Sequence, residues 1–79
     1  MTAAFVLINC HFPFDLRIKD EISKIPTVTS VYRTGGRYDL MVEINAETER
    51  ELRNMIHRDI DTIHGVDATL TMIIAFSGI

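Results

Sequence analysis

The segment Ala3–Cys10 is apolar almost without a break, and it constrains the fold more than any other part of the sequence. A strand with one solvated face would alternate apolar and polar residues, whereas this segment offers apolar side chains to both faces. Both faces are therefore expected to be covered. A domain of this size buries only about 60–65% of the surface that its unfolded chain exposes, so its core is thin.

A helix is expected after the turn that follows this strand. Apolar residues recur along one helical face: Ile18, Ile22 and Ile25. Asp15 is expected to cap the helix by accepting from free backbone N–H groups, and Pro26 to end it.

Three further strands are expected, because β-branched residues and alternation dominate Val28–Thr34, Tyr38–Ile44 and Thr69–Phe76. Gly35-Gly36 forms the turn between the first two of these. The even positions of the middle strand are apolar and are expected to face the helices: Tyr38, Leu40, Val42 and Ile44.

A second helix is predicted by the capping box that Thr48 and Glu51 form. Its apolar stripe consists of Leu52, Met55, Ile56, Ile60 and Ile63. Gly65 is expected to end this helix.

The resulting βαββαβ order predicts one α+β domain over residues 1–79, a ferredoxin-like sandwich with two helices on one face of a four-stranded antiparallel sheet. The other face would then be apolar instead of polar. It would carry Ala4, Val6, Ile8, Val31, Met41, Ile73 and Ala75, or their opposite numbers if the register is reversed. Such a face predicts a dimer at minimum, with two sheets packed face to face around a two-fold axis.

Composition narrows the function classes. The net charge of −3 argues against general nucleic-acid binding, and Cys10, the single cysteine, cannot form a disulfide within the chain. A lone thiol fits a reducing cytoplasm. The start of the chain lacks the positive region of a signal peptide, and no apolar run approaches the length of a membrane helix.

Several motifs resemble the effector domain of the Lrp/AsnC family, often called the RAM domain. They are Ile25–Val28, Val31–Leu40 with its Gly-x-Tyr-Asp element, Ile63–Val66, and Thr69–Ile73 with its Thr-x-Thr element. The resemblance implies a face-to-face dimer that assembles into tetramers or octamers and binds amino acids between dimers. It further implies a role in transcriptional regulation of amino acid metabolism.

One departure from the family pattern is that Met1 leads directly into the first strand, where typical members carry a helix-turn-helix domain. The sequence is similar to the stand-alone form of the module. DNA binding is therefore not carried over, and a full-length regulator of this family is a candidate partner.

The turn between the second and third strands carries the groups that a zwitterionic ligand needs. Glycine N–H groups and an arginine suit a carboxylate, Asp39 suits an ammonium, and two threonines of the last strand offer hydroxyls. The candidate residues are Arg33, Thr34, Gly35, Gly36, Arg37, Tyr38, Asp39, Thr69 and Thr71. The alternative is a structural hairpin turn in which Asp39 pairs with a neighbouring arginine.

Other chemistry has weaker signals. His57, Asp61 and His64 share one helix face at metal-ligand spacing, but a solvated helix face is the favoured interpretation. No catalytic set and no cofactor is expected. Two other classes remain as alternatives: a small dimeric enzyme acting on an organic substrate, and an RNA-binding domain, for which the open face offers Met41 and small aliphatic residues in place of aromatic ones.

Overall fold

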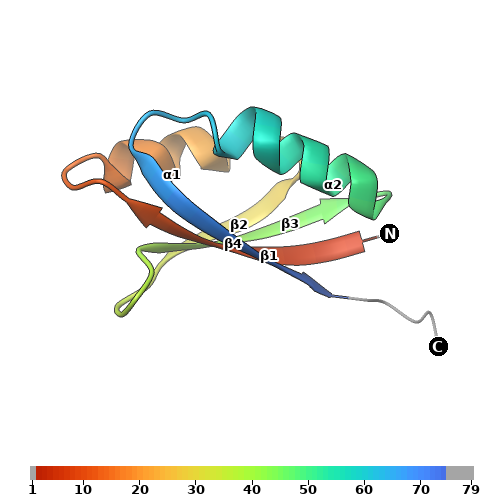
Figure 1. The fold of residues 1–79 in the computed structure, drawn as a ribbon, viewed down its shortest axis with the longest axis horizontal. Helices are drawn as coiled ribbons and strands as arrows, with labels where there is room; N and C mark the ends of the chain where they lie inside the picture. Colours follow the sequence, from red (N-terminus) through yellow and green to blue (C-terminus); the bar gives the residue numbers. More distant parts are fainter. Residues whose placement is uncertain (1, 75–79) are drawn as a thin grey trace.

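The computed structural model describes residues 2–74 of the 79-residue chain (Figure 1). The elements follow the order β1 (Thr2–Cys10), α1 (Asp15–Ser23), β2 (Val28–Arg33), β3 (Leu40–Ala46), α2 (Glu49–Met55), η1 (Ile56–Ile60) and β4 (Val66–Ile74). The expected Ala75 and Phe76 of the last strand lie outside the described residues.

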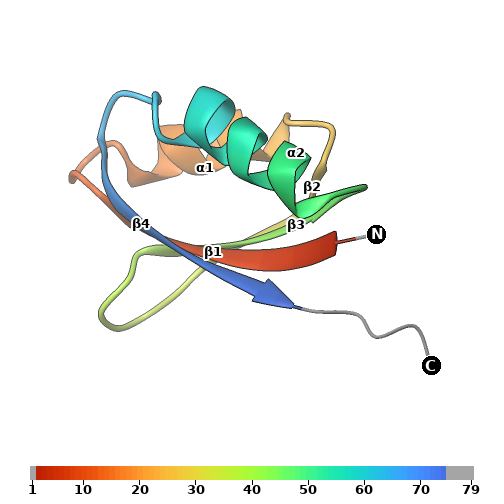
Figure 2. The same cartoon turned by 45° about the vertical axis from the view of Figure 1, so that its right-hand side comes forward.

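The four strands form one antiparallel sheet in the order β2-β3-β1-β4. Both helices lie on the same side of this sheet, while its other side is left uncovered (Figures 1 and 2). This is the predicted ferredoxin-like sandwich. Within residues 2–74, no helix is long and apolar enough to cross a membrane.

The strand register decides which side chains form the core. In β1, Val6 pairs with Val42 and Ile8 pairs with Leu40, and paired residues share a face of the sheet. All four side chains are fully buried beneath the helices. The full buried core consists of Ala4, Val6, Ile8, Ile18, Ile22, Leu40, Val42, Ile44, Leu52, Met55, Ile56 and Ile60.

The first of the two predicted arrangements of the uncovered face is therefore largely wrong. The residues that face the helices instead are Ala4, Val6, Ile8, Val31 and Ile73. Met41 was assigned correctly, and Ala75 is not described. We call the uncovered side the open face. Its four rows across β2, β3, β1 and β4 are Asn9 and Ala68, then Tyr32, Met41, Leu7 and Leu70, then Ser30, Glu43, Phe5 and Met72, then Asn45, Ala3 and Ile74.

Helix α1 begins differently from the prediction. Phe14 occupies the N-cap position without a side-chain hydrogen bond, and Asp15 is the first helical residue. Asp15 is not the cap because its carboxylate accepts a hydrogen bond from Arg33 at 3.1 Å. The helix ends at Ser23, two residues before Ile25 and ahead of Pro26.

Helix α2 begins as predicted, because the Thr48 hydroxyl oxygen accepts from the Glu51 N–H at 3.1 Å. It then widens into the π-helical turn η1, in which the Asp61 N–H donates to the Ile56 carbonyl at 2.9 Å. The sequence pattern did not predict this turn. Both Ile56 and Ile60 stay buried through it, so the apolar stripe is kept.

Candidate ligand-binding site

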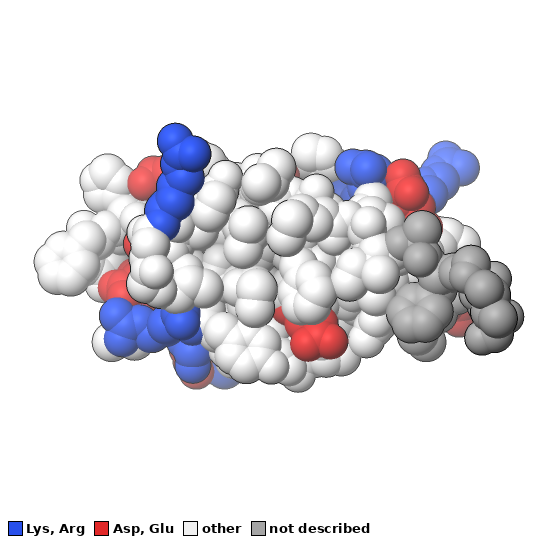
Figure 3. All heavy atoms as spheres, turned by 90° about the horizontal axis from the view of Figure 1, so that it is seen from below, with Lys and Arg blue, Asp and Glu red and all other residues white. Residues whose placement is uncertain are grey.

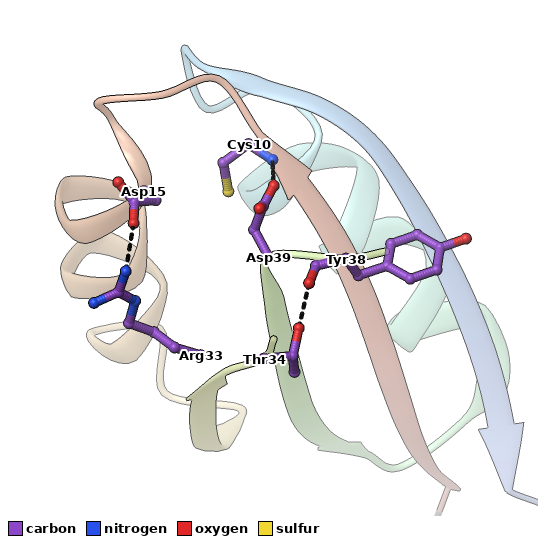
Figure 4. A network of polar contacts seen from close by, with 6 residues as sticks. All are labelled: Cys10, Asp15, Arg33, Thr34, Tyr38 and Asp39. Atoms are coloured by element: carbon purple, nitrogen blue, oxygen red, sulfur yellow. Dashed lines mark hydrogen bonds and ion pairs between the residues drawn. The ribbon is translucent and has the colours of Figure 1, made fainter. Parts of the chain in front are cut away.

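The segment Thr34–Asp39 joins β2 to β3 and is closed on itself by two hydrogen bonds. The Thr34 N–H donates to the Asp39 carbonyl at 3.0 Å, and the Thr34 hydroxyl donates to the Tyr38 carbonyl (Figure 4). This closure explains why β3 begins at Leu40 and not at Tyr38, as the sequence predicted. The loop extends away from the helices (Figures 1 and 2).

The two glycines of this loop face open space. A Cβ atom added at Gly35 or Gly36 would meet nothing within 4 Å. The backbone of Gly36 has φ 154°, a region that other residues rarely adopt. A ligand group can therefore approach this backbone closely.

Asp39 anchors the loop to the end of β1. Its Oδ2 atom accepts from the Cys10 N–H at 2.7 Å, and its own N–H donates to the Ile8 carbonyl at 2.9 Å. The structural alternative proposed an arginine partner; within residues 2–74 the recorded partner is the Cys10 backbone instead. The Asp39 side chain is exposed, so its second oxygen remains available.

The two arginines of the loop region differ. Arg33 lies on the helix side of the sheet and donates to Asp15 of α1 (Figure 4). Arg37 is exposed and forms no ion pair with any described residue. The loop thus has one cation that is free to meet an anionic ligand. Tyr38 points away from Asp39, toward β1 and β4 in the view of Figure 4.

Thr69 and Thr71 lie on β4, at the far edge of the same sheet, and β1 separates them from β3. They pair with Ile8 and Val6, so they share the helix side of the sheet. They lie two strand spacings, about 10 Å, from β3, at which the loop ends. They are on the helix side of the sheet, whereas the loop extends away from the helices. One protomer therefore does not bring the predicted site residues together.

A groove of about 250 Å³ lies beside these threonines, between η1 and β4. Asp61 is central to it: its Oδ1 accepts from the Thr69 hydroxyl at 3.0 Å, and its Oδ2 lies 3.0 Å from His57 Nδ1. Arg53 also lines the groove. The sequence marked Asp61 and His57 only as metal candidates; their spacing was visible, but their proximity to Thr69 was not.

His64 does not join this pair. Its ring lies edge-on to Phe14, with ring centroids 5.5 Å apart, and its carbonyl accepts from Arg17 at 2.8 Å. In the described part of the chain, no three metal-ligating side chains come together. The order of contacts around Asp61 also differs from a hydrolase triad, in which the imidazole stands between the carboxylate and the hydroxyl.

Cys10 has an unreactive environment. Burial, followed by the negative charges of Asp39, Asp15 and Asp67, raises the pKa of its thiol from 9.0 to about 11. The thiolate is the reactive form of cysteine, so Cys10 stays an inert thiol at neutral pH.

A second, larger groove of about 660 Å³ lies at the opposite end of the sheet, between the end of β3 and α2. Its lining includes Thr27, Asn45, Glu47 and Arg58, and none of the predicted site residues. The larger volume of this groove is therefore no reason to place the ligand site there.

A family model described as the Lrp/AsnC ligand binding domain matches residues 3–76. An HTH-type transcriptional regulator of Pyrococcus furiosus is 34% identical over 71 residues, which cover 90% of this chain and 46% of the relative. The chain thus spans about half the length of that relative. A homocitrate synthase of Sulfurisphaera tokodaii is 31% identical over 72 residues, which cover 15% of that enzyme.

The solved structure of a hypothetical protein of Pyrococcus horikoshii has a similar fold, with a TM-score of 0.92 and 26% sequence identity. The likeness covers 99% of this chain and 94% of that one. The same fold therefore occurs in a protein of nearly this length.

Proposed function

The chain belongs to the Lrp/AsnC family of ligand-binding domains, and from this premise we propose that it is a cytoplasmic effector module that binds a free amino acid between protomers. The observation that carries the proposal is the division of polar groups between two edges of the protomer. The loop Thr34–Asp39 offers Arg37 and the N–H groups of its two glycines, which donate to no described backbone group, while the groove at β4 offers Asp61 and Thr69.

These two half-sites are complementary in chemistry. At the loop, Arg37 and the glycine N–H groups suit the carboxylate of the ligand, and the free oxygen of Asp39 suits its ammonium group. The groove of a neighbouring protomer, with polar side chains and a volume of about 250 Å³, suits the ligand's side chain. An amino acid held in this way would link two protomers, so that binding and assembly are coupled.

Assembly begins with the open face. On its middle two strands the apolar side chains are only half-buried, and on β4 Leu70, Met72 and Ile74 are 46%, 45% and 39% exposed. An apolar surface of this kind on a small domain marks an interface. We take the partner to be a second copy, packed sheet on sheet, with further dimers joined through the loops and grooves to form a tetramer or an octamer.

RNA binding fits the open face poorly. The prediction that this face lacks aromatic side chains is nevertheless wrong. Phe5 and Tyr32 lie on that face, so it does carry aromatic side chains. However, the described residues of the face include no lysine or arginine, and Glu43 gives it a negative charge. A phosphate backbone would be repelled there.

Calorimetry against the twenty amino acids tests the proposal directly. At least one is expected to bind at submillimolar concentration, and Arg37→Gln is expected to weaken it about tenfold or more, since a charge-assisted hydrogen bond contributes about 1.5–3 kcal/mol. Arg33→Gln is the matched control, because Arg33 is engaged by Asp15. Asp39→Asn is also expected to weaken binding while keeping an acceptor for the Cys10 N–H.

Two outcomes would contradict this assignment. If no amino acid binds below millimolar concentration, the ligand belongs to another class. If Arg37→Gln binds as tightly as the unaltered protein, or if Arg33→Gln weakens binding equally, the loop does not hold the carboxylate as proposed.

The regulatory output of the module is proposed to come from a partner. The match covers about half of an HTH-type transcriptional regulator, which supports a full-length regulator of the family as the proposed partner. Mixing the tagged protein with such a regulator from the same cell is expected to give hetero-oligomers in native mass spectrometry. Recovery of homo-oligomers alone would exclude this partner.

A further inference from the structure

Glu43 lies close to the centre of the open face. It is in the third of the four rows of that face, between Ser30 of β2 and Phe5 of β1, and Met72 of β4 continues the row. Its strand, β3, is one of the two inner strands of the sheet. Viewed from below in Figure 3, the middle of the face is white, and one red, acidic group lies just below it, toward the lower rim of the view.

No counter-charge faces this carboxylate. From β2, the neighbouring side chains on the face are Ser30 and Tyr32, whose phenol is the only titratable group nearby among residues 2–74. The described residues that β1 and β4 add to the face carry no ionisable side chain: Ala3, Phe5, Leu7, Asn9, Ala68, Leu70, Met72 and Ile74. Glu43 takes part in none of the ion pairs recorded for the described residues.

The area of the face is sufficient for a dimer. Four strands spaced about 4.8 Å apart, with a usable length of about 23 Å, project an area of about 440 Å² per copy. Side chains stand out from the sheet plane, so the accessible area is larger than this projection. Two copies together thus reach about the 1,000 Å² that a specific interface requires. The occupant must be apolar and nearly uncharged, and a second copy of this face has both properties.

A two-fold axis through the centre of this interface brings the two Glu43 side chains close to each other. If the axis runs across the strands, β3 lies over β3 of the second copy, and the two residues are offset along the strands by about one row, roughly 7 Å, which two glutamate side chains can span. If the axis runs along the strands, β3 lies over β1 of the second copy, and the two are offset by about one strand spacing, roughly 4.8 Å. Both side chains point into the layer between the sheets in either case.

We propose that the two Glu43 carboxyl groups meet near the centre of this dimer and share one proton, so that dimer formation takes up a proton from solvent. Two carboxylates that share a site shielded from water cannot both remain ionised at low cost. When both monomers are ionised, two carboxylates and one proton give one carboxyl–carboxylate pair, and no other reactant is needed. The inference rests on the face-to-face dimer proposed above and makes its affinity dependent on pH.

Sedimentation equilibrium of the full chain at about pH 5.5 and about pH 7.5 tests this. Uptake of one proton makes the dimer dissociation constant rise by up to about tenfold per pH unit, so we expect a rise of roughly tenfold or more between these values. Glu43→Gln is expected to remove the pH dependence and to tighten the dimer at the higher pH. Dilution calorimetry in two buffers of different ionisation enthalpy is expected to show about one proton released per dimer dissociated.

Glu47→Gln is the matched control, since Glu47 is an exposed carboxylate just beyond β3. It is expected to keep the full pH dependence, as all three histidines remain in both variants. The inference is overturned if Glu43→Gln keeps the pH dependence of dimer dissociation. It is also overturned if Met72→Asp abolishes the dimer, which places the interface on the open face, while dissociation of the unaltered dimer releases no proton. In the latter case the face-to-face dimer stands; a monomer at both pH values would overturn the dimer itself.

Discussion

Replacing Val6 with aspartate is expected to unfold the protein. Val6 is fully buried between the helices and the sheet, where it pairs with Val42 on one side and Thr71 on the other. No cation or free donor lies among the core residues, so the carboxylate would be buried without a partner. That costs several kcal/mol, a large part of the about 5–15 kcal/mol that stabilises a typical domain. Circular dichroism is expected to show the loss of secondary structure.

The same charge on the opposite side of the sheet is expected to act differently. Met72 is 45% exposed on the open face, so Met72→Asp is expected to leave the fold intact and to abolish the dimer. Sedimentation at micromolar concentration should then give a folded monomer. A dimer of unchanged affinity would show that the protomers associate through another surface, and a folded Val6→Asp variant would contradict the assignment of the two faces.

The sequence alone did not establish which face of β1 packs against the helices. Alternation with a period of two identifies the buried face of a strand only when one face is polar. Both faces of β1 are apolar, so its pattern gives no phase. On β3, by contrast, the charged Glu43 marks the odd face as the one that does not pack against the helices. The phase of β1 then follows from the pairing of Phe5 with Glu43, which is a long-range contact that no local pattern contains.

Sequence motifs predicted a structural feature correctly when the residues that form it are close together in the chain. The capping box of Thr48 and Glu51 forms because both residues are three positions apart on one helical turn. Asp15 is a residue type that often caps helices, but here it is the first helical residue and its carboxylate accepts from Arg33 of β2. The π-helical turn η1 replaces the regular i to i+4 pattern with one wider turn, and an apolar stripe of isoleucines is compatible with both.

In the candidate site, too, the features that depend on neighbouring residues were predictable and those that depend on long-range contacts were not. The Gly35-Gly36 turn was predicted from local composition, and the structure shows both glycines facing open space. Which arginine is free was not predictable, because it depends on Asp15 contacting Arg33. The grouping of Asp61 with Thr69 depends on the turn between η1 and β4, which returns the chain along the helix that it has just left.

Gly65, in that turn, is expected to tolerate substitution much less well than Gly36. Its φ of 101° is one that side chains rarely adopt, and its carbonyl accepts from the His11 N–H at 2.7 Å. An added Cβ would lie 3.0 Å from Cδ1 of Ile18 and 3.2 Å from Cβ of Phe14. Backbone strain and crowding together are expected to make Gly65→Ala lower the free energy of unfolding by about 2–4 kcal/mol.

Gly36→Ala separates these two causes. Gly36 also has a positive φ, but an added Cβ meets nothing within 4 Å there, so only the backbone term remains. The expected loss is about 1 kcal/mol. Urea denaturation of the two variants measures the difference. Equal losses would mean that the contact of Gly65 with Ile18 and Phe14 relaxes without cost, and that this turn is held by backbone conformation alone.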